Sequence, residues 1–125
     1  MPSRGIRTGI DLVDIPRFGI VAGRRGPAFL DRIFTPAELA SRPALQSLAG
    51  GFAAKEAFLK ALGTGLSEGI SWHDVEIVRG EGGQPGLVLA RRAAELLGSG
   101  QASLSISHTS TTAVAVVVIS GGDAP

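Results

Sequence analysis

Two carboxylates and one lysine are the side chains of this sequence best suited to chemistry: Asp11, Glu56 and Lys60. If the segment around Glu56 forms a helix, Phe52 and Glu56 share one face, because residues four apart lie above one another. A carboxylate on an apolar face costs free energy unless a cation, a metal ion or hydrogen bonds receive it. The segment is therefore predicted to be a site. The alternative is a solvated Glu56–Lys60 pair, worth about 0.3–0.5 kcal/mol.

Asp11 lies in an alternating apolar stretch that predicts a strand. On a strand, Asp11 points to the same side as Val13 and Ile15, whereas Asp14 points to the other side. Asp11 is thus directed toward apolar neighbours, where it could meet Glu56 and share a hard divalent cation. Magnesium is bound in this way, by one or two carboxylates together with water and substrate phosphates. The alternative is that Asp11 only caps a helix or a turn.

His108 closes a strand-like segment in which serines alternate with Leu104 and Ile106. The alternation places His108 on the apolar side, where it is either a structural residue or a neutral imidazole that bonds a ligand. No serine–histidine–acid triad is indicated beyond the presence of these residue types. The sequence holds two histidines and no cysteine, without a metal-ligand spacing, which argues against zinc.

The glycine-rich turn Gly63-Thr64-Gly65 follows the predicted helix of Glu56. It is either a C-terminal stop of that helix or a phosphate site made by backbone amides together with Lys60. The order and spacing of its glycines and lysine exclude a P-loop.

Three arginines, Arg17, Arg24 and Arg25, cluster around the first predicted helix. They form either a solvated face or a docking surface for an acidic partner protein, since opposite charge steers encounter.

Length and composition restrict the protein to a few classes. The 125 residues form one domain, 1–125, with residues 120–125 expected to be a frayed tail. The net charge of +1 gives no reason to expect nucleic acid or a membrane as partner. The absence of cysteine excludes a disulfide scaffold, a zinc–thiolate site and a cysteine nucleophile. The longest apolar stretch, Ala113–Ile119, is too short to span a bilayer, and a cytoplasmic location is expected.

The periodicity predicts an α+β fold. Thr35, Pro36 and Glu38 form the pattern of a capping box, Gly23 is expected to stop the first helix, and each glycine of the Gly50–Gly51 pair weakens the long helix by roughly 1 kcal/mol. Strands are predicted over 6–15, 72–79, 87–89, 102–108 and 112–119, and helices over 16–22, 27–33, from Thr35 to before Pro43, 43–62 and 90–97.

The last predicted strand is apolar on both sides, so both sides must be covered. In so short a chain one cover can come from another subunit, which indicates self-association.

Three segments together resemble a known family: Gly9–Phe18, Phe52–Ala57 and Ser105–His108. Their order and spacing, and the chain length, are similar to those of the small single-domain holo-acyl-carrier-protein synthases, a branch of the 4′-phosphopantetheinyl transferases. The resemblance runs from Gly5 to Ile119. It implies a small, mostly antiparallel sheet wrapped around a long central helix.

The resemblance also implies an activity. Family members transfer the phosphopantetheine arm of coenzyme A to a carrier-protein serine and release adenosine 3′,5′-bisphosphate. They need Mg²⁺ and usually work as homotrimers with the active site between subunits. By this resemblance Asp11 and Glu56 bind the metal and Lys60 contacts phosphate, whereas the general base stays open.

The remaining implied roles concern substrates. The resemblance assigns coenzyme A contacts to Gly63, Thr64, Gly65, Pro85 and His108, and contacts with the acidic acyl carrier protein to Arg17, Arg24 and Arg25.

The sequence departs from the family pattern at two positions. Gly51 stands where the family commonly has arginine, and Gln84 where it commonly has lysine. Three explanations fit these two departures. Coenzyme A contacts are weaker in this protein, Arg91 or Arg92 supplies the missing cation, or the protein serves a specialised carrier of polyketide rather than fatty acid synthesis. Two alternatives to the enzyme stay open: a non-catalytic coenzyme A or nucleotide-binding module, and a structural oligomer whose acids form salt bridges.

Overall fold

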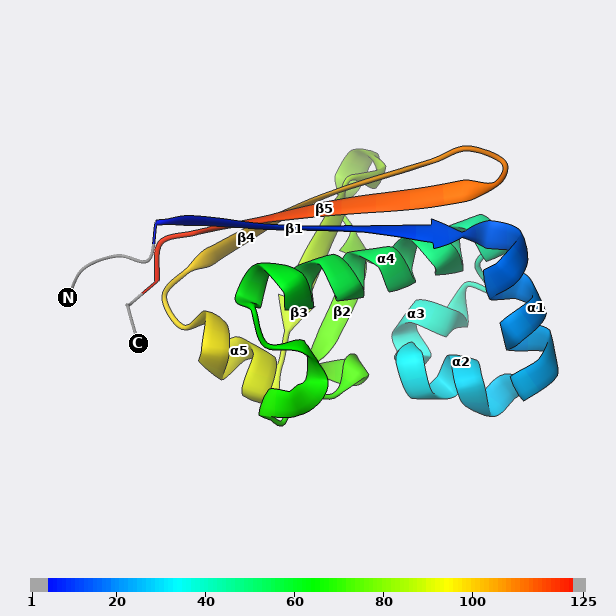
Figure 1. The fold of residues 1–125 in the computed structure, drawn as a ribbon, viewed down its shortest axis with the longest axis horizontal. Coiled ribbons are helices and arrows are strands. Elements are labelled where there is room, and N and C mark those ends of the chain that lie inside the picture. The colour runs from blue at the N-terminus through cyan, green and yellow to red at the C-terminus, as the bar shows by residue number, and fades with distance from the viewer. Residues whose placement is uncertain (1–4, 123–125) are drawn as a thin grey trace.

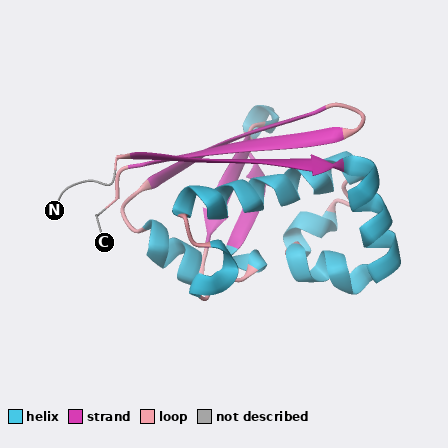
Figure 2. Cartoon of the chain, in the orientation of Figure 1, coloured by secondary structure: helices cyan, strands magenta, loops and turns pink. Residues whose placement is uncertain are grey.

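The computed structural model describes residues 5–122, which form an α+β fold (Figures 1 and 2). The strands are β1 (Ile6–Asp14), β2 (Val75–Arg79), β3 (Pro85–Leu89), β4 (Gln101–His108) and β5 (Thr112–Ser120). The α-helices are α1 (Ile15–Arg25), α2 (Pro27–Ile33), α3 (Pro36–Ala40), α4 (Leu45–Leu62) and α5 (Arg91–Leu97). Three short 3₁₀ helices are η1 (Gly65–Glu68), η2 (Trp72–Asp74) and η3 (Glu81–Gly83).

The strands form two antiparallel sheets rather than one. The larger has the order β1-β5-β4, and β2 pairs with β3 in a separate hairpin. Helix α4 lies along one face of the larger sheet, with α1, α2 and α3 near one of its ends and α5 near the other (Figure 1). The long central helix of the expected fold is therefore confirmed. No helix among the described residues is long and apolar enough to cross a membrane.

Alternation along the strands decides which side chains meet α4. On β1, Gly9 and Val13 are buried and Asp11 is half-buried, whereas the residues between them are exposed. On β5, Ala113, Ala115 and every second residue beyond them are buried in the same way. The prediction that Asp11 shares a side with Val13 is confirmed, because successive side chains of a strand point to opposite faces.

Helix α4 is buried on most of its surface and is rich in alanine. Gly50 is required by packing: a Cβ here would lie 2.9 Å from Ile106 Cγ2, so a small residue lets β4 approach the helix. The close contact accounts for a glycine that helix propensity alone disfavours. The helix starts at Leu45, two residues after the predicted start, and Gly63 ends it with a φ of 82°.

Sheet and helix approach each other closely at Gly9 of β1. A Cβ at this position would overlap the carbonyl oxygen of Ala57 and lie 2.7 Å from the backbone nitrogen of Ala61. Only glycine lets the strand lie directly on the helix backbone. The contact is one residue beyond Glu56 in α4 and two residues before Asp11 in β1, so it fixes the two elements that carry the predicted site.

Two predicted boundaries were wrong. Gly23 does not stop α1, which continues to Arg25 and ends at Gly26, whose φ is 77°. Gly23 is exposed with no atom near its missing Cβ, so the helix tolerates it, and cations in the last turn favour the extension. The segment Trp72–Asp74 is a 3₁₀ turn rather than strand, because Ser71 and Asp74 form a capping box.

The other predicted elements are confirmed, with ends shifted by two residues or fewer. The capping box at Thr35 is present, with Thr35 Oγ1 accepting from Glu38 N at 3.1 Å and Glu38 Oε1 accepting from Thr35 N at 2.8 Å. The expected frayed tail was wrong at Ser120, which pairs in β5 with both neighbouring strands because β1 and β4 reach that far. Residues 123–125 lie outside the described residues.

Candidate active site

Asp11, Glu56 and Lys60 meet where β1 crosses α4. Lys60 Nζ donates to Asp11 Oδ1 at 3.0 Å and to the Ile10 carbonyl oxygen at 3.0 Å. The Asp11 side chain is 18% exposed and that of Lys60 is 54% exposed. The lysine therefore contacts strand β1. The alternative prediction, a solvated Glu56–Lys60 pair within the helix, does not include this contact. A half-exposed pair of this kind adds little stability by itself.

Glu56 lies beside Asp11 in an open cavity of about 580 Å³. Burial raises the pKa of Glu56, the negative charge of Asp11 raises it further, and Lys60 opposes the two. One part of the cavity lining is charged and consists of Asp11, Asp14, Glu56 and Arg17. The other part is apolar, with the aliphatic and aromatic residues Leu12, Val13, Phe18, Val21, Phe29 and Phe52.

The two carboxylates fit a divalent cation. Asp11 disfavours the ionised form of Glu56, and a cation between the two would remove that repulsion. In the described part of the chain no group of three or more His, Asp or Glu side chains could hold a metal. A cation here would thus have two carboxylates and would complete its shell with water or substrate oxygens, which is the usual set for Mg²⁺.

Asp14, three residues after Asp11, has a structural role. Its Oδ1 accepts from Arg17 N at 2.8 Å and so caps α1. The capping role considered for Asp11 therefore belongs to Asp14, and Asp11 remains directed at α4. Satisfying an otherwise unpaired amide at a helix start contributes about 1 kcal/mol.

The three arginines are not equivalent. Arg17 lies in the first turn of α1 and lines the cavity of Asp11 and Glu56. Arg24 and Arg25 are exposed in the last turn, about two turns away, and the Arg25 guanidinium lies 5.6 Å from the centre of the Phe29 ring. Arg17 thus links the α1 surface with the carboxylates.

The turn Gly63-Thr64-Gly65 ends α4. The amide of Gly63 donates to the carbonyl oxygens of Leu59 and Lys60, and the amide of Thr64 donates to Leu59 at 3.3 Å. These two amides donate to carbonyl oxygens of the last helical turn, so they act as the C-terminal stop of α4. The Thr64 hydroxyl donates to the Gly65 carbonyl oxygen at 3.0 Å. A phosphate contact by this turn stays a prediction.

His108 and Pro85 do not line the cavity of Asp11 and Glu56. His108 ends β4 and is exposed, with Nδ1 at 3.1 Å from the Thr109 carbonyl oxygen. The β4–β5 connection lies near one end of α4, whereas the turn at Gly63 lies at the other (Figure 1). Pro85 opens β3, opposite Arg79. Their contacts with coenzyme A stay predictions.

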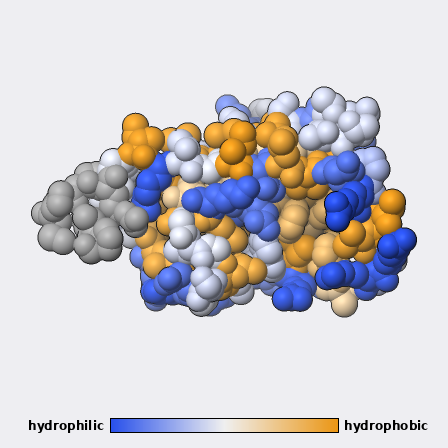
Figure 3. All heavy atoms as spheres, in the orientation of Figure 1, coloured by the Kyte–Doolittle hydropathy of each residue, from blue (hydrophilic) through white to orange (hydrophobic). Residues whose placement is uncertain are grey.

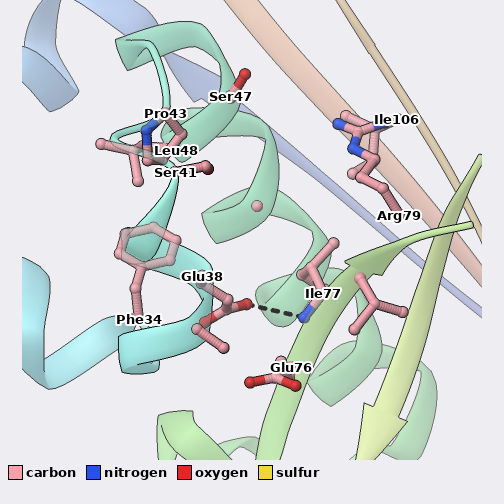
Figure 4. Close-up of a pocket in the computed structure, with 13 residues that line it drawn as sticks. Phe34, Glu38, Ser41, Pro43, Ser47, Leu48, Glu76, Ile77, Arg79 and Ile106 are labelled. Carbon is pink, nitrogen blue, oxygen red and sulfur yellow. Dashed lines mark hydrogen bonds between the residues drawn. The ribbon is translucent and has the colours of Figure 1, made fainter. Parts of the chain in front are cut away.

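A second cavity, of about 390 Å³, lies beside Gly51 (Figure 4). Figure 4 shows Phe34 on one side of it, and Arg79 and Ile106 on the other. A Cβ at Gly51 would lie 3.3 Å from Phe34 Cε1. Among the residues that line this cavity, Arg79 of β2 is the basic one.

Arg91 and Arg92, which were considered as substitutes, are anchored elsewhere. Arg91 pairs with the buried Asp74 at 2.8 Å, and Arg92 donates to the Glu68 carbonyl oxygen at 3.0 Å. Neither lines the cavity beside Gly51.

Sequence reasoning missed the role of Lys55, which is fully buried and paired with Glu38 at 2.8 Å. Burial lowers the pKa of Lys55, whereas the hydrogen bond and charge of Glu38 raise it. The signal was present in the sequence: Gly51, Phe58 and Leu62 lie four residues before, three after and seven after Lys55. These spacings put the lysine on an apolar face.

Comparison with known proteins agrees with this geometry. The sequence matches the 4′-phosphopantetheinyl transferase superfamily over residues 7–117. It is 49% identical over 119 residues to a holo-[acyl-carrier-protein] synthase of Geobacter sp. (strain M21), covering 90% of this chain and 95% of the relative. It is 45% identical to that of Koribacter versatilis, with the same coverage. The crystal structure of Helicobacter pylori holo-[acyl-carrier-protein] synthase in complex with coenzyme A superposes with a TM-score of 0.82 at 35% identity, covering 90% of this chain and 99% of that one.

The fold and the paired acids define a class, and the chain belongs to the 4′-phosphopantetheinyl transferase superfamily. The resemblance seen in the sequence is thereby confirmed. Within the superfamily its relatives are holo-[acyl-carrier-protein] synthases, so the protein is a phosphopantetheinyl transferase of that branch.

Proposed function

We propose that this protein transfers the 4′-phosphopantetheine arm of coenzyme A to a serine of an apo-acyl carrier protein and releases adenosine 3′,5′-bisphosphate, with Mg²⁺ as cofactor. The observation that carries the proposal is the meeting of Asp11, Glu56 and Lys60 at one cavity, with Arg17 in its lining. Relatives of this branch bear the name of the activity, and one structure similar to the chain contains coenzyme A.

Asp11 and Glu56 are the residues that would hold Mg²⁺, which as a Lewis acid stabilises the charge that develops on phosphate oxygens. Lys60 is oriented by its bond to Asp11 and its side chain is half-exposed. An ammonium fixed at this point stabilises a phosphate oxygen without reorganising during the reaction.

The nucleophile comes from the carrier, so the enzyme needs only a proton acceptor for the serine hydroxyl. Glu56 is the group at the cavity whose pKa is raised, by burial and by Asp11. A bound Mg²⁺ would lower this pKa and occupy the carboxylate oxygens, so Glu56 would serve as a metal ligand rather than as the free base.

Arg17 would meet the acidic carrier at the mouth of the cavity, and Arg24 and Arg25 would extend the contact along α1. All three are exposed and lie on one helix. A positive patch next to the reacting groups raises the rate of encounter with an acidic partner. Carriers of fatty acid and of polyketide synthesis share this acidity, so both are substrates to assay.

We further propose that the protein assembles as a homotrimer with its active sites between subunits. The outer face of the larger sheet is rich in apolar residues along β1 and β5, and Figure 3 shows hydrophobic side chains along this side of the molecule. Its exposed apolar residues are Ile6, Ile10, Leu12, Val116 and Val118. A contiguous patch of this kind is typical of an interface between subunits.

The separation of the expected coenzyme A contacts supports this assembly. His108 ends β4, and the connection from β4 to β5 lies near the opposite end of α4 from the turn that follows this helix (Figure 1). A second copy that supplies its own His108 next to the first copy's Gly63 would complete one site. Size-exclusion chromatography with light scattering should give three times the mass of the chain, and a monomer at assay concentration would contradict the assembly.

The function is tested by intact-mass spectrometry of an apo-acyl carrier protein incubated with the protein, coenzyme A and Mg²⁺. A gain of one phosphopantetheine arm, absent with Glu56→Ala, is the expected result. Binding of coenzyme A without transfer to any carrier would favour the non-catalytic module instead. An unchanged melting temperature with Mg²⁺, together with no coenzyme A binding, would favour the structural oligomer.

A further inference from the structure

The ammonium group of Lys55 is buried next to the candidate active site. We call this group and its hydrogen-bond partners the Lys55 junction. Lys55 precedes Glu56 in α4 and its side chain has no exposed surface. Its Nζ donates to the Ile33 carbonyl oxygen at 2.9 Å, to Glu38 Oε1 at 2.8 Å and to the Trp72 carbonyl oxygen at 3.2 Å. An ammonium has three hydrogens to donate, so these three acceptors use all of them.

The acceptors belong to three different elements. Ile33 ends α2, Glu38 lies in α3 and Trp72 begins η2. Glu38 extends the junction further, because its Oε2 accepts from the backbone nitrogen of Ile77 in β2 at 2.8 Å. Lys55 thus ties one turn of α4 to α2, α3 and η2 directly, and to β2 through Glu38.

The other chain neighbour of Glu56 is fixed from the opposite side. The carbonyl oxygen of Ala57 is in contact with the backbone of Gly9, where no side chain fits between strand and helix. The turn of α4 that presents Glu56 is therefore held between β1 on one side and the Lys55 junction on the other. Asp11 is on the strand that forms the first of these contacts.

Stability alone does not explain a buried ion pair at this point. Pairs of this kind are often replaced by apolar residues with no loss of stability, because removing both charges from water offsets their attraction. A pair that joins five elements does something an apolar contact does not: it fixes the direction and register of those elements, since its hydrogen bonds need defined geometry.

We propose that Lys55 is a positioning residue that sets the separation of Glu56 from Asp11 and thereby the affinity of the two carboxylates for a divalent cation. The inference rests on the proposed function, since it assumes that these acids hold the metal. Lys55 itself does not touch the cation or the substrates.

The test is the double variant Lys55→Met/Glu38→Gln, which leaves no unpaired charge in the interior. We expect it to fold and to bind Mn²⁺, measured by electron paramagnetic resonance without substrates, about tenfold more weakly than the wild type, as found for residues that orient metal ligands. The Mg²⁺ concentration for half-maximal transfer should rise by the same factor. The single variant Glu38→Gln keeps the two carbonyl contacts of Lys55 and should show a smaller loss of Mn²⁺ affinity. This variant is measured instead if the double variant does not fold.

The matched control is Arg91→Gln/Asp74→Asn, which removes the other ion pair with a buried carboxylate. It should lower the melting temperature and leave the Mn²⁺ affinity within twofold of the wild type. A folded double variant with wild-type Mn²⁺ affinity would overturn the positioning role while transfer by the wild type still stands. A wild type that binds no Mn²⁺ and transfers nothing would overturn the proposed function and this inference together.

Discussion

Adding one methyl group at Gly9 should separate the two halves of the active site. In Gly9→Ala the new Cβ would lie 2.7 Å from the Ala61 nitrogen, 3.0 Å from the Ala57 carbonyl carbon and closer still to the Ala57 oxygen. Carbon and oxygen atoms in close packing stay about 3.3 Å apart. The atoms in the way are helix backbone, so no side chain can rotate to make room. We expect β1 to withdraw from α4 by roughly 1 Å.

This displacement has two measurable consequences. Overpacking in a close-packed region lowers the free energy of unfolding by about 1–3 kcal/mol, and a clash with backbone atoms is expected at the upper end of this range. Asp11 is two residues along the same strand and moves with it, so the 3.0 Å contact with Lys60 is lost and the distance to Glu56 grows. A misplacement of about 1 Å in a catalytic site reduces the rate about 100-fold.

The assay combines thermal unfolding with the initial rate of carrier modification by intact mass. The control is Gly23→Ala in α1, an exposed helical glycine with nothing near its missing Cβ. The control should gain up to about 1 kcal/mol from helix propensity and keep its activity. If Gly9→Ala unfolds at the wild-type temperature and modifies the carrier at the wild-type rate, the argument that this contact positions the carboxylates is wrong.

Three further variants test separate parts of the site. Burial and Asp11 raise the pKa of Glu56, so without a metal ion its ionised form destabilises the fold at neutral pH; this penalty shrinks as pH falls through the raised pKa and is gone below the ordinary value. Glu56→Gln should therefore abolish transfer yet raise the melting temperature at neutral pH, with a gain that shrinks in acid; equal gains at all pH values would contradict the sign. Arg17→Glu should raise KM for the acidic carrier roughly tenfold, most at low salt, with KM for coenzyme A unchanged; an effect on both would point to a folding defect. Gly51→Arg should lower KM for coenzyme A several-fold if the cavity beside Arg79 receives phosphate, and an unchanged KM would exclude that use of the cavity.

Local patterns predicted most of the secondary structure. The capping box at Thr35 is present because its hydrogen bonds join residues three apart, which the sequence displays directly. The alternation that placed Asp11 with Val13 is equally local. The errors came from features that local patterns describe poorly. A glycine such as Gly23 ends a helix only if the chain turns there, and the 3₁₀ turn at Trp72 has the same apolar content as a strand start.

The candidate site was predicted in part. The sequence indicated that Asp11 and Glu56 could meet, and the structure brings them to one cavity. It did not show that Lys60 bonds Asp11 rather than standing free, since these residues are 49 positions apart. It gave no role to Gly9 or Lys55, because a close backbone approach and a buried ammonium are defined by the elements that surround them.

Local spacing was enough to predict the order of elements, the helix and strand faces, and the residue types able to bind a metal and phosphate, since each depends on neighbours within a few positions. How these parts meet depends on tertiary packing. Strand β1 packs against α4 at Gly9, Lys55 bonds to three elements, and the β4–β5 connection lies far from the turn that ends α4. These are contacts between residues distant in the chain, whose formation depends on the packing of the whole core rather than on any local spacing.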